Sequence, residues 1–410
     1  MQTHLADFIK GTREGDEAEA ILRACVHCGF CTATCPTYQL LGDERDGPRG
    51  RIYLIKQVLE GAPPGASTQI HLDRCLTCRS CESTCPSGVQ YGRLLDIGRQ
   101  VVEQRVRRPL RERIERAVLR EALPRPWIFK GALTLGRLFK PLLSKPLQDK
   151  LPRVPPAGQW PRRSHARKML VLAGCVQPSM GPNINAASAR VLDALGVQLI
   201  EAPKAGCCGA LRYHLNDQAG GLDDMRRNID AWWPMLEQVE AIVMTASGCG
   251  VTVKEYGALL AHDEAYAHKA RRISQMTRDL CEVMPQFQAE LVEKIGKVGT
   301  AREPVAYHPP CSLQHGQQIR GQVEGLLGAL GIEVRLCADS HMCCGSAGSY
   351  SLLQGQLAGE LRMRKLDHLH ATGAPCIVSA NIGCIAHLQA ATDTPVMHWI
   401  ELLERALGAA

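Results

Sequence analysis

Residues 25–36 read CVHCGFCTATCP and residues 75–86 read CLTCRSCESTCP, and the N-terminal part of the chain is organised around these two stretches. Each places four cysteines in the spacing C-x2-C-x2-C-x3-C, with a proline after the last cysteine. Structural zinc sites favour two CxxC pairs separated by a longer spacer, and cysteines this dense cannot readily pair as disulfides. Three thiolates at steps of three suit a tight loop around one iron–sulfur cube. The two stretches therefore predict two [4Fe–4S] clusters.

The ligands of each cluster follow from the fourth cysteine of each run. In two-cluster ferredoxins this cysteine binds the cluster of the other run. We therefore expect one cluster on Cys25, Cys28, Cys31 and Cys85, and the other on Cys75, Cys78, Cys81 and Cys35. His27 and His71 lie near these runs, but eight thiolates already fill the ligand positions, so neither histidine is expected to be a ligand.

The spacer between the runs predicts a helical domain. Residues 36–61 contain the segment Asp46-Gly47-Pro48-Arg49-Gly50-Arg51, followed by an amphipathic stretch at 52–59. A spacer that contains a helix suits the α-helical type of ferredoxin better than the compact β-hairpin type. We expect an α-helical dicluster ferredoxin domain over residues 1–98, in which Arg49 and Arg51 either compensate cluster charge or are solvated at the surface.

Length and composition place the rest of the chain among globular proteins. Its 410 residues exceed what one hydrophobic core usually serves, and 45% of them are hydrophobic. No apolar run approaches the ~20 residues that span a bilayer, and the charged N-terminus does not resemble an export signal. In such a chain, 19 cysteines indicate metal binding or redox chemistry in a cytoplasmic protein rather than disulfide bonds.

Residues 99–165 predict a basic, proline-punctuated arm of short helices and linker. Between Arg99 and Lys168 there are 19 Lys/Arg and 5 Asp/Glu. A segment with this charge is attracted to an acidic partner subunit or to anionic lipid. A solvated linker over the protein's own acidic surface is the alternative. The aromatic pattern of a nucleic-acid site is missing, so no nucleic acid is expected.

The remaining residues contain an internal repeat. Cys175, Cys207, Cys208 and Cys249 recur about 136 positions later as Cys311, Cys343, Cys344 and Cys384. Matching strand-like and helix-like stretches surround both sets, which predicts two α/β units with largely parallel sheets at residues 166–295 and 300–410. Cys281, Cys337 and Cys376 lie outside the pattern and are expected to be small buried hydrophobes.

The paired Cys-Cys-Gly units resemble the cysteine-rich CCG domains of heterodisulfide reductases and of the iron–sulfur subunits of 2-hydroxyacid and glycerol-3-phosphate dehydrogenases. Residues 24–38, 46–54, 228–234 and 380–384 closely resemble the glycolate oxidase iron–sulfur subunits. The stretch Trp232-Trp233-Pro234 and the segment Gly47-Pro48-Arg49-Gly50-Arg51 discriminate best, because cluster ligation in general does not require them. The expected fold is therefore multidomain, with the ferredoxin domain followed by two CCG units.

One departure from that family weakens part of the comparison. Full CCG motifs end in CxxC, whereas Ala246 and Asn381 stand at the partner positions here. Each unit still offers four cysteines for a metal or cluster, and the two units could also share one site. Buried structural thiols are an equally good interpretation. His308, His315 and His341 flank the second unit, either as ligands or proton relays or as structural histidines.

The resemblance implies an electron-transfer subunit of an oxidoreductase that itself contains no catalytic residue. No GxGxxG, P-loop, HExxH or nucleophile elbow is present, so FAD is expected only in partner subunits, which in this family oxidise glycolate to glyoxylate. Electrons would pass to a respiratory acceptor such as quinone, at the cytoplasmic face of the inner membrane. The alternatives are a conduit for D-lactate or glycerol-3-phosphate oxidation, or a thiol–disulfide enzyme.

Overall fold

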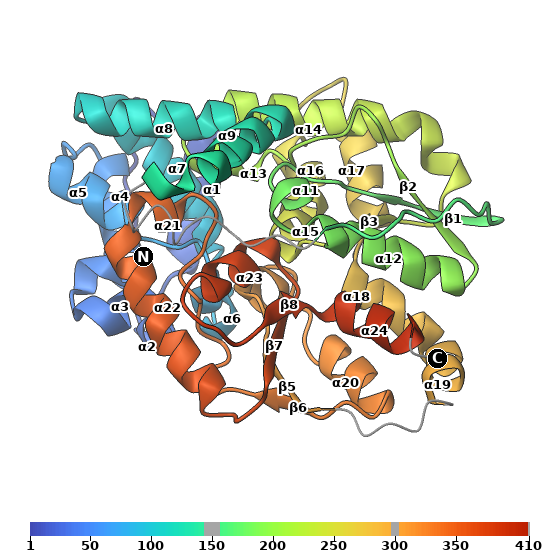
Figure 1. The fold of residues 1–410 in the computed structure, drawn as a ribbon. Coiled ribbons are helices and arrows are strands. Elements are labelled where there is room, and N and C mark those ends of the chain that lie inside the picture. The colour runs from blue at the N-terminus through green and yellow to red at the C-terminus, as the bar shows by residue number, and fades with distance from the viewer. Residues whose placement is uncertain (143–155, 297–302, 409–410) are drawn as a thin grey trace.

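The computed structural model describes residues 1–142, 156–296 and 303–408 (Figure 1). A helical N-terminal domain lies on one side of the molecule, and two α/β units lie against it. The multidomain prediction of a helical domain followed by two α/β units is confirmed. Among the described residues, no helix is long and apolar enough to cross a membrane.

The N-terminal domain is built from short helices around one apolar core. Its long helices α4 and α7 pack against each other, and Gly98 of α7 permits this because a Cβ there would lie 2.6 Å from Ile55 of α4. Helix α7 continues through position 98, where the sequence placed the domain boundary. The elements are α1 (Arg13–Ala24), α2 (Phe30–Ala33), α3 (Pro36–Leu41), η1 (Glu44–Asp46), α4 (Pro48–Leu59), α5 (Ala66–Asp73), α6 (Ser80–Thr84) and α7 (Tyr91–Arg105).

The basic arm begins with two helices on the surface. Helices α8 (Leu110–Ala122) and α9 (Pro126–Leu138) are followed by the short turn η2 (Lys140–Leu142). Both helices lie along one edge of the molecule (Figure 1). Arg212 of the first α/β unit donates a hydrogen bond of 2.8 Å to Glu121 of α8, and α9 contacts the same unit. Residues 143–155 of the expected arm lie outside the described residues.

The first α/β unit holds a parallel four-stranded sheet in the order β2-β1-β3-β4. Strand β1 lies between β2 and β3, the two strands that follow it in the chain. The connection from β1 to β2 and the connection from β2 to β3 therefore cross the sheet in opposite directions. Its elements are β1 (Arg167–Val171), α11 (Gln177–Met180), α12 (Pro182–Ala194), β2 (Val197–Glu201), α13 (Ala210–His214), α14 (Gln218–Trp232), η3 (Trp233–Gln238), β3 (Ile242–Met244), α15 (Ser247–Lys254), α16 (Tyr256–Leu259), α17 (Ala267–Met276), β4 (Thr277–Asp279), α18 (Leu280–Val283), η4 (Met284–Phe287) and α19 (Gln288–Gly296).

The second α/β unit repeats this topology with a parallel sheet in the order β6-β5-β7-β8. Its first strand is followed by a π-helical turn, η5. The elements are β5 (Val305–His308), η5 (Ser312–Gly316), α20 (Gln322–Ala329), β6 (Val334–Leu336), α21 (Tyr350–Leu353), α22 (Gly355–His370), β7 (Cys376–Ser379), α23 (Ile382–Gln389), β8 (Val396–His398) and α24 (Trp399–Gly408).

The two units exchange their last helices. Helix α24 follows the last strand of the second unit but packs on α12 of the first, and α19 follows the last strand of the first but packs on α20 of the second. Arg190 of α12 forms an ion pair with Glu404 of α24, and Asn183 donates a hydrogen bond of 2.9 Å to Glu401. A continuous apolar core joins both sheets. The repeats are therefore one packed body with internal pseudo-symmetry.

Candidate metal centres

The two cysteine runs fold into two copies of the same loop. His27 and Gly29 in the first run have φ values of 57° and 86°, and the equivalent Thr77 and Arg79 in the second run have 54° and 59°. Backbone that alternates into the left-handed region turns successive N–H groups into one concave surface, a nest that holds anionic groups such as iron–sulfur clusters. Both loops thus present backbone donors together with their thiols.

The first cavity gathers four cysteines from both runs. Cys75, Cys78 and Cys81 line it together with Cys35, and the space it encloses outside protein atoms is about 300 Å³, part of it open to solvent. Arg51 and Tyr91 complete its inner wall. These four thiols are the set that the sequence assigns to one cluster.

The second cavity gathers the other set. Cys25, Cys28 and Cys31 line it together with Cys85, and it encloses about 440 Å³ that also opens to solvent. Pro48, Cys81 and Tyr91 line both cavities, so the two spaces are neighbours separated by little more than these side chains. His27 also lines the second cavity, whereas His71 lies in neither lining and contacts Asp46 at 3.0 Å.

The donor chemistry of both cavities fits anionic iron–sulfur clusters. The first lining offers four cysteine thiols, the second offers the four thiols of its own set together with Cys81, and neither contains a carboxylate. Burial raises the pKa of the Cys31 thiol to about 11 and that of Cys78 well above its usual value, so these thiols need bound cations to become thiolates. None of the 19 cysteines forms a disulfide.

Arg51 supplies a permanent positive charge to the first cavity. Its side chain is 1% exposed and forms an ion pair of 3.4 Å with the equally buried Asp46. Its guanidinium also donates to the carbonyl of His71 at 2.7 Å and to the Thr37 hydroxyl at 3.1 Å. It lies close enough to Cys75 and Cys35 to interact with both thiols electrostatically. Of the two interpretations, charge compensation fits Arg51. Arg49, at the second cavity, is 37% exposed and pairs with Glu44.

Each α/β unit gathers its four repeat cysteines at the carboxyl ends of its parallel strands, where open α/β sheets bind ligands. In the first unit, Cys175 contacts Cys207, which contacts Cys208, which in turn contacts Cys249. In the second unit the same chain of contacts joins Cys311, Cys343, Cys344 and Cys384, and the Sγ atoms of Cys311 and Cys343 are 3.9 Å apart. The chain of thiol contacts stays within each unit, which favours two separate sites over a shared one.

The glycine of each Cys-Cys-Gly turn is required by the backbone. Gly209 and Gly345 have φ values of 90° and 91°, and a Cβ would lie 2.5 Å from the carbonyl oxygen of Gly221 and 2.6 Å from that of Ala358. Left-handed backbone with such close contact excludes other residues at low cost. The two turns therefore present the paired cysteines in the same way.

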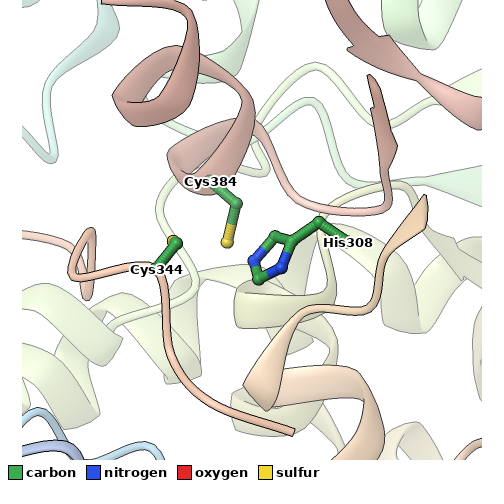
Figure 2. Close-up of side chains that lie close together, drawn as sticks. All are labelled: His308, Cys344 and Cys384. Carbon is green, nitrogen blue, oxygen red and sulfur yellow. The ribbon is translucent and has the colours of Figure 1, made fainter. Parts of the chain in front are cut away.

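The second unit adds a histidine to its thiols. His308 ends β5, and one of its ring nitrogens lies with the Sγ atoms of Cys344 and Cys384 in a group whose members are all within 4.8 Å of one another (Figure 2). All three residues are buried. His315 instead contacts the Ser83 hydroxyl at 3.0 Å and the carbonyl of His341 at 2.9 Å, so it connects the unit to the N-terminal domain.

The first cavity faces the thiols of the second unit. Leu76 and Cys78 share an apolar cluster with Cys311, Cys343 and Tyr350. Burial raises the pKa of Cys78, and the Cys311 thiol raises it further. The Tyr350 hydroxyl is buried without a hydrogen-bond partner, and its pKa is raised by burial and by the Cys75 and Cys343 thiols.

Sequence reasoning missed two residues of these sites. Tyr91 lines both cavities, and its hydroxyl donates a hydrogen bond of 3.6 Å to the Sγ of Cys75. Tyr350 lies outside every motif, and only the docking of two distant segments brings it to the cavity. Of the cysteines outside the repeat, Cys281 and Cys337 are buried, as expected, whereas Cys376 at the start of β7 is only half-buried.

Comparison with known proteins finds two domain families in the chain. A 4Fe-4S dicluster domain matches residues 21–89, and a cysteine-rich domain matches residues 169–254 and 305–389. The chain is 54% identical to the glycolate oxidase iron-sulfur subunit of Escherichia coli (strain K12) over 99% of both chains. It is 29% identical to the probable glycolate oxidase iron-sulfur subunit of Bacillus subtilis (strain 168) over 96% of this chain and 95% of the relative. Lactate utilization protein A of the same B. subtilis strain is 22% identical over 58% of this chain and 98% of its own.

Proposed function

The chain belongs to the family of glycolate oxidase iron–sulfur subunits, and from this premise we propose that it passes electrons from a flavin in partner subunits toward the respiratory chain. The partner subunits would oxidise glycolate to glyoxylate on FAD, and this chain would be the conduit. The observation that carries the proposal is the pair of adjoining cavities, each of which is lined by one of the two expected sets of four cysteines.

The ligands proposed for the two clusters follow the cavity linings. Cys25, Cys28, Cys31 and Cys85 would hold one [4Fe–4S] cluster, and Cys75, Cys78, Cys81 and Cys35 the other. Each bound cluster supplies reversible one-electron chemistry. The chain supplies burial, backbone donors from the two nests, a hydrogen bond from Tyr91 and the charge of Arg51. Hydrogen bonds and charge near the sulfurs favour the reduced state.

The repeat cysteines are proposed as further metal or cluster sites beyond the two cavities. Four thiols meet in each unit, Cys175, Cys207, Cys208 and Cys249 in the first and Cys311, Cys343, Cys344 and Cys384 in the second. Cys78 shares an apolar cluster with Cys311 and Cys343, so the second unit packs directly against the first cavity.

We place the protein at the cytoplasmic face of the inner membrane, with a quinone as the final acceptor. Helix α9 exposes Trp127, Leu135 and Leu138 at helical spacing, and Trp127 is 74% exposed. Lys130 and Lys140 are exposed beside them. An exposed apolar stripe with an aromatic residue and flanking lysines suits an anionic membrane interface.

Two alternatives have different support. The similarity to lactate utilization protein A favours a lactate-linked conduit as the second candidate. A thiol–disulfide enzyme is less well supported, because Ala246 and Asn381 replace the fifth cysteine of each unit and serve as the N-terminal caps of α15 and α23.

The function is tested with the assembled complex. Glycolate should reduce the flavin in a complex that carries Cys78→Ser, but reduction of a quinone analogue should fall at least tenfold, because the cluster beyond the flavin lacks a ligand. Cys376→Ser, which changes a thiol outside the sites, should leave both rates unchanged. Lactate oxidation without glycolate oxidation would favour the second candidate, and full quinone reduction by the Cys78 variant would refute the conduit.

The crossed ligation has its own test. Electron paramagnetic resonance (EPR) of the reduced chain should show that Cys85→Ser perturbs the same cluster signal as Cys28→Ser, and that Cys35→Ser perturbs the same signal as Cys78→Ser. If Cys85→Ser instead matched Cys78→Ser, each run would hold its own cluster and the assignment would be wrong.

A further inference from the structure

We propose that His308, Cys344 and Cys384 bind a single divalent ion of the zinc class through one nitrogen and two sulfur ligands, a site that the first repeat cannot form. The inference deepens the proposal that the second repeat binds a metal. It does not depend on the two clusters of the N-terminal domain or on electron transfer.

The three ligands come from three separate elements that converge at one point. His308 is the last residue of β5, Cys344 lies in the Cys-Cys-Gly turn, and Cys384 lies in the first turn of α23 (Figure 2). Their exposed fractions are 1%, 1% and 4%. One histidine and two cysteines, both ligand types that zinc favours, thus meet away from solvent.

His308 is the observation that points to a ligand. Both of its ring nitrogens are buried without a hydrogen-bond partner, and the close-up shows the ring directed toward the two cysteines. A buried polar group without a partner is costly, so a structural histidine at this point would be a poor choice. A bound cation would satisfy one nitrogen, and burial keeps the imidazole in the neutral form that binds metal by lowering its pKa well below the usual value.

The spacing of the trio favours one ion over a cluster. One ligand atom from each residue lies within 4.8 Å of the other two, as required for ligands around a single tetrahedral ion. Within the part of the chain that the structure describes, the eight cysteines of the two cavities form no group this compact, and neither do the four of the first repeat. The thiols expected to hold clusters are therefore arranged more widely than this trio.

The surroundings hold the ligands in place. The Asn381 amide donates to the Sγ of Cys384 at 3.5 Å, and the Ser346 backbone N–H hydrogen-bonds the Cys344 thiol. The Ser379 hydroxyl donates to the carbonyl of His308 at 2.9 Å and fixes the end of β5. Contacts of this kind orient metal ligands. The thiol of Cys343 contacts that of Cys344.

The first repeat lacks the nitrogen ligand. His308 lies three residues before Cys311, and the residue three positions before Cys175 is Leu172. Leu172 is 3% exposed and packs in an apolar core. The repeats have therefore diverged at this position, which explains how one unit could hold a single ion while the other keeps an all-sulfur set.

The test uses the full chain purified anaerobically with its native metals. Elemental analysis should give about one equivalent of zinc-class metal per chain, and X-ray absorption at that metal's edge should show sulfur scatterers together with a nitrogen at about 2.0–2.1 Å. His308→Leu, which installs the residue of the first repeat, should lose the nitrogen signal and about one equivalent of metal. His341→Leu, a change of a neighbouring histidine outside the site, should keep both.

A second variant and an independent signal keep the proposal falsifiable. Cys384→Ser should also lose the equivalent of metal, and unchanged EPR of the N-terminal clusters in both variants would show that the chain is folded. Retention of the metal with unchanged absorption spectra in His308→Leu would overturn the proposal, as would a shell of iron and sulfur alone at this site. Loss of the cluster signals from the wild-type chain would refute the electron conduit but would leave this measurement of zinc and nitrogen intact.

Discussion

Arg51 places a fixed positive charge against the thiols of one cavity, where it stabilises the extra negative charge of a reduced cluster. Arg51→Gln should therefore lower the midpoint potential of the cluster on Cys75, Cys78, Cys81 and Cys35. A loss of about 1 kcal/mol of differential stabilisation corresponds to roughly 40 mV for one electron. An EPR-monitored redox titration measures the shift.

Arg49→Gln is the matched control at the other cavity. Both arginines pair with a carboxylate, but Arg49 is 37% exposed and Arg51 is 1% exposed. Solvent screens the charge of Arg49 more strongly, so its replacement should shift the neighbouring cluster by less than Arg51→Gln shifts its own. Equal shifts, or a rise in potential in the Arg51 variant, would contradict the role assigned to the buried charge. Iron content should remain that of the wild-type chain in both variants.

The glycines of the two Cys-Cys-Gly turns make a second prediction for single residues. Gly209→Ala or Gly345→Ala introduces a Cβ into left-handed backbone within 2.6 Å of a carbonyl oxygen, and strain of this kind costs about 1–3 kcal/mol. Thermal unfolding should show a lower Tm for each variant. Gly325→Ala in α20, where a Cβ meets nothing within 4 Å, should be neutral or stabilising, and a similar loss in all three variants would refute the explanation.

Among the helices, α18 begins at a buried carboxylate, that of Asp279. Asp279 caps this helix, accepts a hydrogen bond of 3.0 Å from Gln317 of the other repeat and is 2% exposed. Burial raises its pKa from 3.8 to about 6. The unfolded chain ionises at the lower value, so stability is complete below about pH 4, is lost as the pH rises to about 6 and stays low above that.

Asp279→Asn removes this titration and keeps a side chain that can cap the helix. We expect the variant to be more stable than the wild type at pH 7–8, by at most roughly 3 kcal/mol for a shift of this size. The difference should shrink as the pH falls from 7 to 5. Anaerobic thermal unfolding at a series of pH values measures this difference. If the stability of the variant relative to wild type were lower at pH 8 than at pH 5, the predicted sign would be wrong.

The exposed face of α9 makes a prediction about membranes. Trp127→Glu combined with Leu138→Glu should reduce co-sedimentation of the chain with phosphatidylglycerol vesicles at least tenfold, because each apolar side chain contributes about 1.5–3 kcal/mol when it leaves water. Ala132→Glu adds a charge to another exposed face of the same helix and should have a smaller effect. Equal binding of all three proteins would contradict a membrane contact through this stripe.

At the scale of the whole molecule, the sequence was most informative where function depends on local spacing. Cysteines three residues apart must share a loop, so the spacing predicted the two cavity loops, and the 136-residue offset predicted two similar sheets. Spacing does not decide between the two interpretations of Arg51, because burial depends on packing that spacing does not describe. The same holds for the role of His308.

The features that the sequence does not predict are those that depend on packing between segments distant in the chain. No pattern in α19 or α24 indicates that each covers the other repeat, because an amphipathic helix can pack on either sheet. The contact between Cys78 and Tyr350 likewise arises from docking of segments more than 270 positions apart. This docking packs the second repeat directly against one of the two cavities.

The most direct test of the account is a single turnover followed by rapid freezing and EPR. The anaerobic complex of this chain with its flavin-bearing subunits would be mixed with one equivalent of glycolate. We predict that the signals of two [4Fe–4S] clusters appear as the reduced flavin is reoxidised, and that Cys78→Ser and Cys28→Ser each remove a different one of them. A flavin that passes its electrons to the native acceptor at full rate while both clusters stay oxidised would contradict the account.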